Sequence, residues 1–163
     1  MIRHLIITLA ATLFTSPVFA RIGETFDQIE ARYGPQVPRS MAPDELGNHT
    51  ITYNFHGFTI VVTFVDRKSE VELFKKCKEG IPCDKEWATM SEAEVAAILA
   101  AYESVGVTWK AQEGVKRPLW WTSSDQRLKA INMFNQLQIG TAHYIEERAA
   151  RNRERESDRL KGF

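Results

Sequence analysis

The chain has 163 residues, of which 21 are basic and 21 acidic, so its formal net charge is zero. This length is enough to bury one hydrophobic core or two small fused ones. A balanced charge offers no basic face to the phosphates of nucleic acid and no field that would steer a strongly charged partner. We therefore do not expect nucleic acid as a partner.

Residues 1–20 predict a cleavable secretory signal peptide. Arg3 gives the segment a short positive start, a run of apolar and small residues follows, and Ala20 is the small residue before the expected cut. The run is well short of the roughly 20 residues that span a bilayer, and we expect no membrane span elsewhere. Cleavage between Ala20 and Arg21 would deliver a soluble chain to the periplasm or the extracellular medium. A retained anchor or a buried N-terminal strand is the alternative.

The first unit, residues 21–76, is expected to be a helix followed by a three-stranded antiparallel meander. Thr25 and Gln28 form a capping-box pattern at the start of the helix, and Gly34 suits its end. After a Pro-rich loop, β-branched and aromatic residues alternate with polar ones at period two, which is typical of strands. We expect turns at 56–57 and 66–68, with the third strand through Val71 and Leu73.

A loop at residues 77–90 contains both cysteines of the chain, Cys77 and Cys83. Gly80 and Pro82 lie between them and favour a tight turn. In an oxidising compartment two such close cysteines are expected to form a structural disulfide. Half of a zinc site is the alternative, but the neighbouring sequence supplies no histidine to complete it.

The second unit, residues 91–142, repeats the order of helix and then antiparallel strands. Ser91 and Glu94 form another capping box, and apolar residues follow with helical spacing. The expected strands are 107–109, 119–122, 128–134 and 137–140. Residues 143–163 are expected to be a charged C-terminal helix or tail whose last dozen residues are solvated and fray. Together these elements predict an α+β fold of two tandem-like helix–meander units with both helices on one face.

Three segments carry a resemblance to known families. They are an I-G-E-T…R-Y-G opening at 22–34, a G-F-x-I-x-V-x-F strand at 57–64 and a W-x-S-x-D-x-x-L-x-A-I element at 121–131. In these segments the chain is similar to small exported bacterial proteins of no assigned function. The opening and meander also resemble the outer-membrane assembly lipoprotein family, whose lipidated cysteine is absent here. The doubled layout resembles the β-lactamase inhibitory proteins. The resemblance implies a rigid sheet scaffold used for protein contacts.

Side chains that could carry chemistry are few. The familiar nucleophile, zinc and phosphate-loop motifs are absent from the sequence, and we expect no cofactor and no metal. Glu70 and Glu72 lie two residues apart on an expected strand, where their carboxylates could stand about 7 Å apart and do acid–base work. That role requires a cleft in which they face His56 or Asp66. The other interpretation places both carboxylates on a solvated outer face.

Trp120 and Trp121 are the most informative pair for binding. Adjacent residues of a strand point to opposite faces, so one tryptophan can enter the core while the other lies outside or beneath the C-terminal helix. An exposed tryptophan would be an anchor for a partner.

The sequence as a whole favours an exported, non-enzymatic binding or interaction module. A small acid–base hydrolase using the carboxylates of the first sheet and a subunit of an envelope complex are the alternatives. A protein partner would be another exported or envelope protein. The oligomeric state stays open.

Overall fold

The structure is a computed structural model that describes residues 22–38, 42–44, 46–83, 85–103, 107–114, 119–133 and 135–161. The expected signal peptide and its cleavage point between Ala20 and Arg21 lie outside the described residues. The described chain is mixed α+β, as expected. Its helices are α1 (Phe26–Tyr33), α2 (Glu92–Ala101) and α3 (Ala142–Leu160). Its strands are β1 (Ala42–Pro43), β2 (His49–Phe55), β3 (Phe58–Val65), β4 (Lys68–Cys77), β5 (Trp87–Ala88), β6 (Trp109–Ala111), β7 (Leu119–Ser123), β8 (Leu128–Met133) and β9 (Gln136–Thr141).

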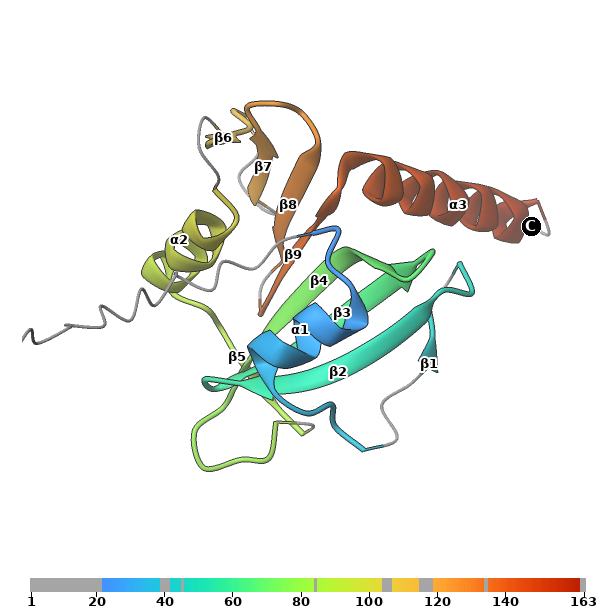
Figure 1. The fold of residues 1–163 in the computed structure, drawn as a ribbon. Coiled ribbons are helices and arrows are strands. Elements are labelled where there is room, and N and C mark those ends of the chain that lie inside the picture. The colour runs from blue at the N-terminus through green and yellow to red at the C-terminus, as the bar shows by residue number, and fades with distance from the viewer. Residues whose placement is uncertain are drawn as a thin grey trace, which may run out of the picture.

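All strands belong to one antiparallel sheet (Figure 1). Its order is β1-β2-β3-β4-β9-β8-β7-β6, and β5 pairs with the end of β4. The meander β2–β4 and the meander β6–β9 meet where β9 pairs with β4, with Val71 opposite Gly140 and Phe74 opposite Leu137. The two halves of the chain therefore share a single sheet.

Both α1 and α2 contribute buried residues to one core on this sheet. Each helix begins with the capping box that the sequence predicts: the Thr25 side chain accepts from the backbone of Gln28, and the Ser91 side chain from that of Glu94. Their apolar residues join strand residues in one core. Its buried members include Ile29, Tyr33, Tyr53, Ile60, Val62, Phe74, Val95, Leu99, Tyr102, Leu137 and Ile139.

The C-terminal helix α3 runs away from the sheet (Figure 1). Tyr144 and Ile145 in its first turn are buried, whereas residues 151–161 are exposed. The solvation expected for this end agrees with the structure, in which the helix continues to Leu160, and its fraying stays a prediction. Charged residues with good helix propensity and ion pairs such as Glu147–Arg151 sustain the helix without a buried face.

The side chain of Glu72 in β4 lies on the buried face of the sheet and not on a solvated one. The interpretation that places both carboxylates on a solvated outer face is wrong for Glu72, whose side chain is 0% exposed. Glu72 pairs with Val62 on one side and with Ile139 on the other, both core residues, so it lies on the face covered by the helices. Val71 is buried on the other face, and the pattern of alternation alone could not distinguish the two arrangements.

The expected disulfide between Cys77 and Cys83 is present. It closes the turn that leads from the end of β4 towards β5. Among the described residues, no helix is both long enough and apolar enough to cross a membrane. The strand expected at 107–109 is shifted by two residues and forms the edge strand β6.

Candidate functional site

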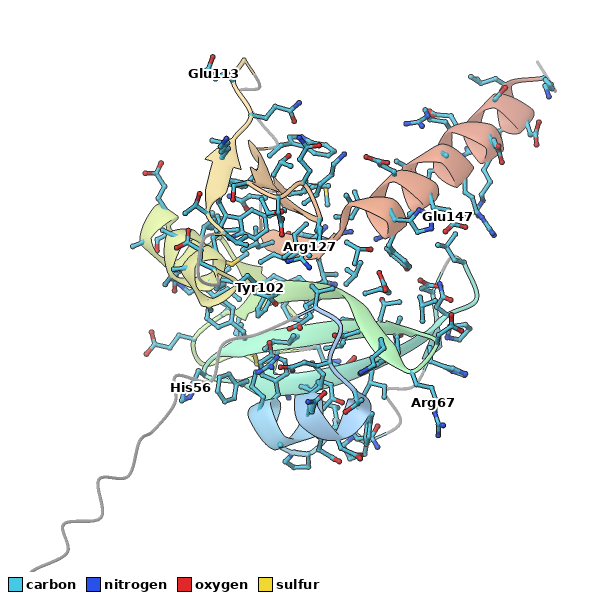
Figure 2. All side chains as sticks on the ribbon, turned by 45° about the horizontal axis from the view of Figure 1, so that its top comes forward. His56, Arg67, Tyr102, Glu113, Arg127 and Glu147 are labelled. Atoms are coloured by element: carbon cyan, nitrogen blue, oxygen red, sulfur yellow. A yellow bond between two sulfur atoms is a disulfide. The ribbon has the colours of Figure 1, made fainter. Side chains whose placement is uncertain are left out.

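A pocket of about 320 Å³ opens between α1, α2 and the hairpin formed by β2 and β3. Most of its surface is apolar. The side chains that line it are Arg32, Tyr33, Phe55, His56, Phe58, Ile60, Phe74, Ala97, Ile98, Ala101 and Tyr102. Figure 2 labels two of these lining residues, His56 at the tip of the β2–β3 hairpin and Tyr102 at the end of α2. Both lie on the same side of the molecule.

Aromatic rings form opposite walls of this pocket. Tyr33 and Phe55 make an edge-to-face contact with ring centroids 5.4 Å apart. Phe74 and Tyr102 are perpendicular to each other at 6.3 Å. Edge-to-face pairs of this kind hold aromatic walls in place and leave ring faces and edges for a further aromatic group.

The polar end of the pocket is built around the buried carboxylate of Glu72. The Tyr33 hydroxyl donates a hydrogen bond to it. Nη1 of Arg32 lies 3.9 Å from its Oε1. Tyr102 lies beside the same carboxylate and favours its charged form, although its hydroxyl makes no well-formed hydrogen bond. Three residues that line the pocket thus converge on one acid.

Burial controls the ionisation of this cluster. It raises the pKa of the Glu72 carboxyl above its usual range, although the hydrogen bond from Tyr33 and the charge of Arg32 act in the opposite direction. Burial and the neighbouring Glu72 also raise the pKa of the Tyr33 hydroxyl, which stays protonated and acts as a donor. Burial by itself would lower the pKa of Arg32, but Tyr33, Glu72 and Glu24 outweigh it and keep the guanidinium charged.

Arg32 is held in place on two sides. Its Nη2 makes an ion pair with Glu24, just before α1. Its guanidinium carbon lies 5.5 Å from the centroid of the Tyr33 ring. The backbone of Glu24 is in turn fixed by Ser69, whose Oγ accepts from the Glu24 N–H at 3.0 Å.

The carboxylates and their expected partners do not converge. A β-bulge in β4 falls at Glu70, whose carboxylate accepts a hydrogen bond from Thr141. His56 and Asp66 occupy the turns at opposite ends of β3, roughly 25 Å apart at the usual rise per strand residue. Figure 2 shows this separation, with His56 and Arg67, the neighbour of Asp66, at opposite ends of the sheet.

The tryptophan pair is divided between the two faces of β7, as expected for a strand. Trp121 packs against the core from the face covered by the helices. Trp120 lies on the other face and is half-buried. If this pair binds a partner, Trp120 is the one on the face away from this core.

The sequence did not single out Arg32, Tyr33 or Tyr102 as site residues. Tyr33 and Tyr102 each stand at the C-terminal end of a helix that buries one side, where an aromatic residue is usually interpreted as part of the core. The sequence did contain one indication of the site. Both helices end in a tyrosine, Tyr33 and Tyr102, and Arg32 precedes the first of them.

Within the described ranges, no group of three or more His, Cys, Asp and Glu side chains could hold a metal ion. No protein-family model, curated protein or solved structure was found to match this chain.

Proposed function

We propose that the chain is an exported, non-enzymatic binding module that holds a small apolar molecule between α1 and α2. The observation that carries this proposal is the pocket of about 320 Å³, which has aromatic walls and few polar groups. Ligand sites in proteins are concave and mostly apolar, with a small number of polar groups that fix orientation. Arg32, Tyr33 and Tyr102 supply those groups here.

Export is supported by two features. The Cys77–Cys83 disulfide suits an oxidising compartment, and residues 1–20 have the pattern of a signal peptide. The same proposal includes two further points. The chain is related to small exported proteins, and it consists of two helix–meander units in tandem. In this proposal the shared sheet is the rigid scaffold that positions the pocket.

The geometry favours binding over acid–base hydrolysis. Glu72 is fully buried behind phenol and guanidinium groups, and Glu70 is hydrogen bonded to Thr141. A general acid or base must come within hydrogen-bond reach of its substrate. Glu72 does not line the pocket, so it serves better as a support for the residues that do.

Filling the mouth of the pocket tests the proposal. Ala97 lines the pocket, whereas the adjacent Ala96 is exposed on α2 outside it. We expect the neutral fluorescent probe N-phenylnaphthylamine to gain emission on binding the wild type. Ala97→Trp should weaken this binding by about tenfold or more, because the indole occupies the cavity.

Ala96→Trp is the matched control, since it adds the same side chain one position away and should bind as the wild type does. Absence of probe binding by the wild type, or equal binding by both variants, would overturn the proposal.

A further inference from the structure

Arg32 carries buried hydrogen-bond donors that make no well-formed hydrogen bond. Its side chain is only 6% exposed. Nη2 pairs with Glu24, while the 3.9 Å between Nη1 and Glu72 is too long for a hydrogen bond. Among the described residues, Nε and Nη1 make no well-formed hydrogen bond, although the Tyr33 hydroxyl lies beside the guanidinium. Buried donors of a charged group are costly to leave unpaired, so an acceptor from outside the chain would be bound favourably.

That acceptor can arrive through the pocket, because Arg32 is one of its lining residues. The guanidinium is already fixed by Glu24 and by its position over the Tyr33 ring. A preorganised donor loses little side-chain entropy when a ligand binds. The polar head of a ligand should therefore meet Arg32 while the rest of the ligand occupies the apolar part.

Charge selects the kind of head group. The positive charge of Arg32 is already balanced by Glu24, whose side chain is 16% exposed. Glu72 adds either no charge or one negative charge, depending on its protonation. In both cases an anionic ligand would leave the buried site with uncompensated negative charge, which is costly at low dielectric. A cationic head group would be repelled by the positive charge of the Arg32 guanidinium. A neutral acceptor satisfies the donors without either cost.

The walls select the body of the ligand. Aromatic rings from α1, the β2–β3 hairpin, β4 and α2 surround the cavity, including Tyr33, Phe55, Phe74 and Tyr102. Rings arranged in edge-to-face pairs offer both faces and edges to a flat guest, which favours an aromatic body over a flexible chain.

We propose that this pocket binds a neutral aromatic compound bearing a carbonyl-type acceptor, such as an aromatic amide, with the acceptor hydrogen bonded to Arg32. This inference rests on the proposed function of the pocket. It assigns Arg32 as the residue that determines head-group specificity.

A series of ligands with one ring system and different heads tests the inference on the wild-type protein. Naphthamide, naphthoate, naphthylmethylamine and naphthalene share the aromatic body and differ in acceptor and charge. Titration calorimetry should show naphthamide binding about tenfold or more tighter than each of the other three.

The outcomes of the series distinguish a failure of this inference from a failure of the proposed function. Equal affinity for naphthamide and naphthalene would mean that water satisfies Arg32, and tightest binding of naphthoate or the amine would mean that the head is charged. Either result overturns the inference while leaving the pocket as a binding site. If none of the four binds, the proposed function itself fails.

Arg32→Lys provides a second readout. The lysine keeps a positive charge for Glu24 but removes the planar guanidinium donors. We expect the advantage of naphthamide over naphthalene to disappear, with naphthalene affinity unchanged. An advantage that survives in a folded Arg32→Lys protein would show that another group receives the carbonyl. The wild-type series stands even if this variant does not fold.

Discussion

Glu72 lies between the sheet and two helices. Tyr33 and Arg32 reach it from α1, and Tyr102 reaches it from the end of α2. A carboxyl group with no exposed surface is costly to ionise, and these neighbours offset only part of that cost. Glu72 therefore holds the polar groups of the pocket in position, but its burial makes the stability of the fold depend on pH.

The raised pKa of Glu72 predicts how that stability varies with pH. The folded protein holds the Glu72 proton more tightly than the unfolded chain, in which the carboxyl has a pKa near 4.5. The stabilising contribution is complete below about pH 4.5 and is lost as the pH rises through the folded-state pKa. Glu72→Gln should remove this dependence. The free energy of unfolding of the wild type should then fall relative to that of the variant, by up to about 1.4 kcal/mol per pH unit.

Denaturant unfolding at several pH values between acid and neutral measures this difference. Glu70→Gln is the matched control on the same strand and should keep the pH dependence of the wild type, because Glu72 is still present. Parallel stability curves for the wild type and Glu72→Gln would contradict the prediction.

At the scale of elements, α2 forms one wall of the pocket and is fixed at both ends. At its start, the capping box joins Ser91 to Glu94, and Lys76 of β4 bridges to the same glutamate at 2.9 Å. These hydrogen bonds, first among them the one from Lys76, hold the pKa of Glu94 at about 2. Near its end, the Leu99 carbonyl accepts from the indole N–H of Trp109 at 2.8 Å.

Removing the cap should loosen the start of this wall. Ser91→Ala loses the acceptor for the Glu94 N–H, and we expect a loss of about 1 kcal/mol in the free energy of unfolding. Ser91→Asn restores a good capping side chain and should cost much less. Equal losses for the two variants, measured by denaturant unfolding, would show that the cap contributes little.

The success of the sequence prediction also differs between elements. The caps of α1 and α2 and the two hairpin turns of the first meander depend on residues within a few positions of each other, and the structure agrees with them. The orientation of β4 depends on what covers each face. Val71 and Leu73 alternate with Glu70 and Glu72, so a solvated Glu72 was a reasonable but wrong expectation.

At the scale of the whole molecule, the two halves are joined by the pairing of β4 with β9. This contact links residues about 65 positions apart, such as Phe74 and Leu137. No local pattern of the sequence encodes it. The same is true of the pocket, which forms only when the ends of α1 and α2 meet over the sheet. The elements were therefore predictable, whereas the site was not.

The seam between the halves depends on close backbone approach at Gly140. A Cβ placed there would lie 2.5 Å from Cγ2 of Val71 and 2.8 Å from the backbone oxygen of Glu70. The valine could adjust, but the carbonyl belongs to the paired strand and cannot move without shifting β9 off β4. We expect Gly140→Ala to lower the free energy of unfolding by about 1–3 kcal/mol, the usual cost of overpacking.

Gly57→Ala separates this steric effect from the general cost of replacing glycine. Gly57 lies in the β2–β3 turn with φ of 80° and open space around its Cα, so its substitution adds backbone strain without a clash. Tryptophan fluorescence, to which Trp109, Trp120 and Trp121 contribute together with Trp87, should report an altered native state only for Gly140→Ala. An unperturbed spectrum and wild-type stability for Gly140→Ala would mean that β9 does not sit against β4 in this register, and the shared sheet on which the pocket is built would have to be redrawn.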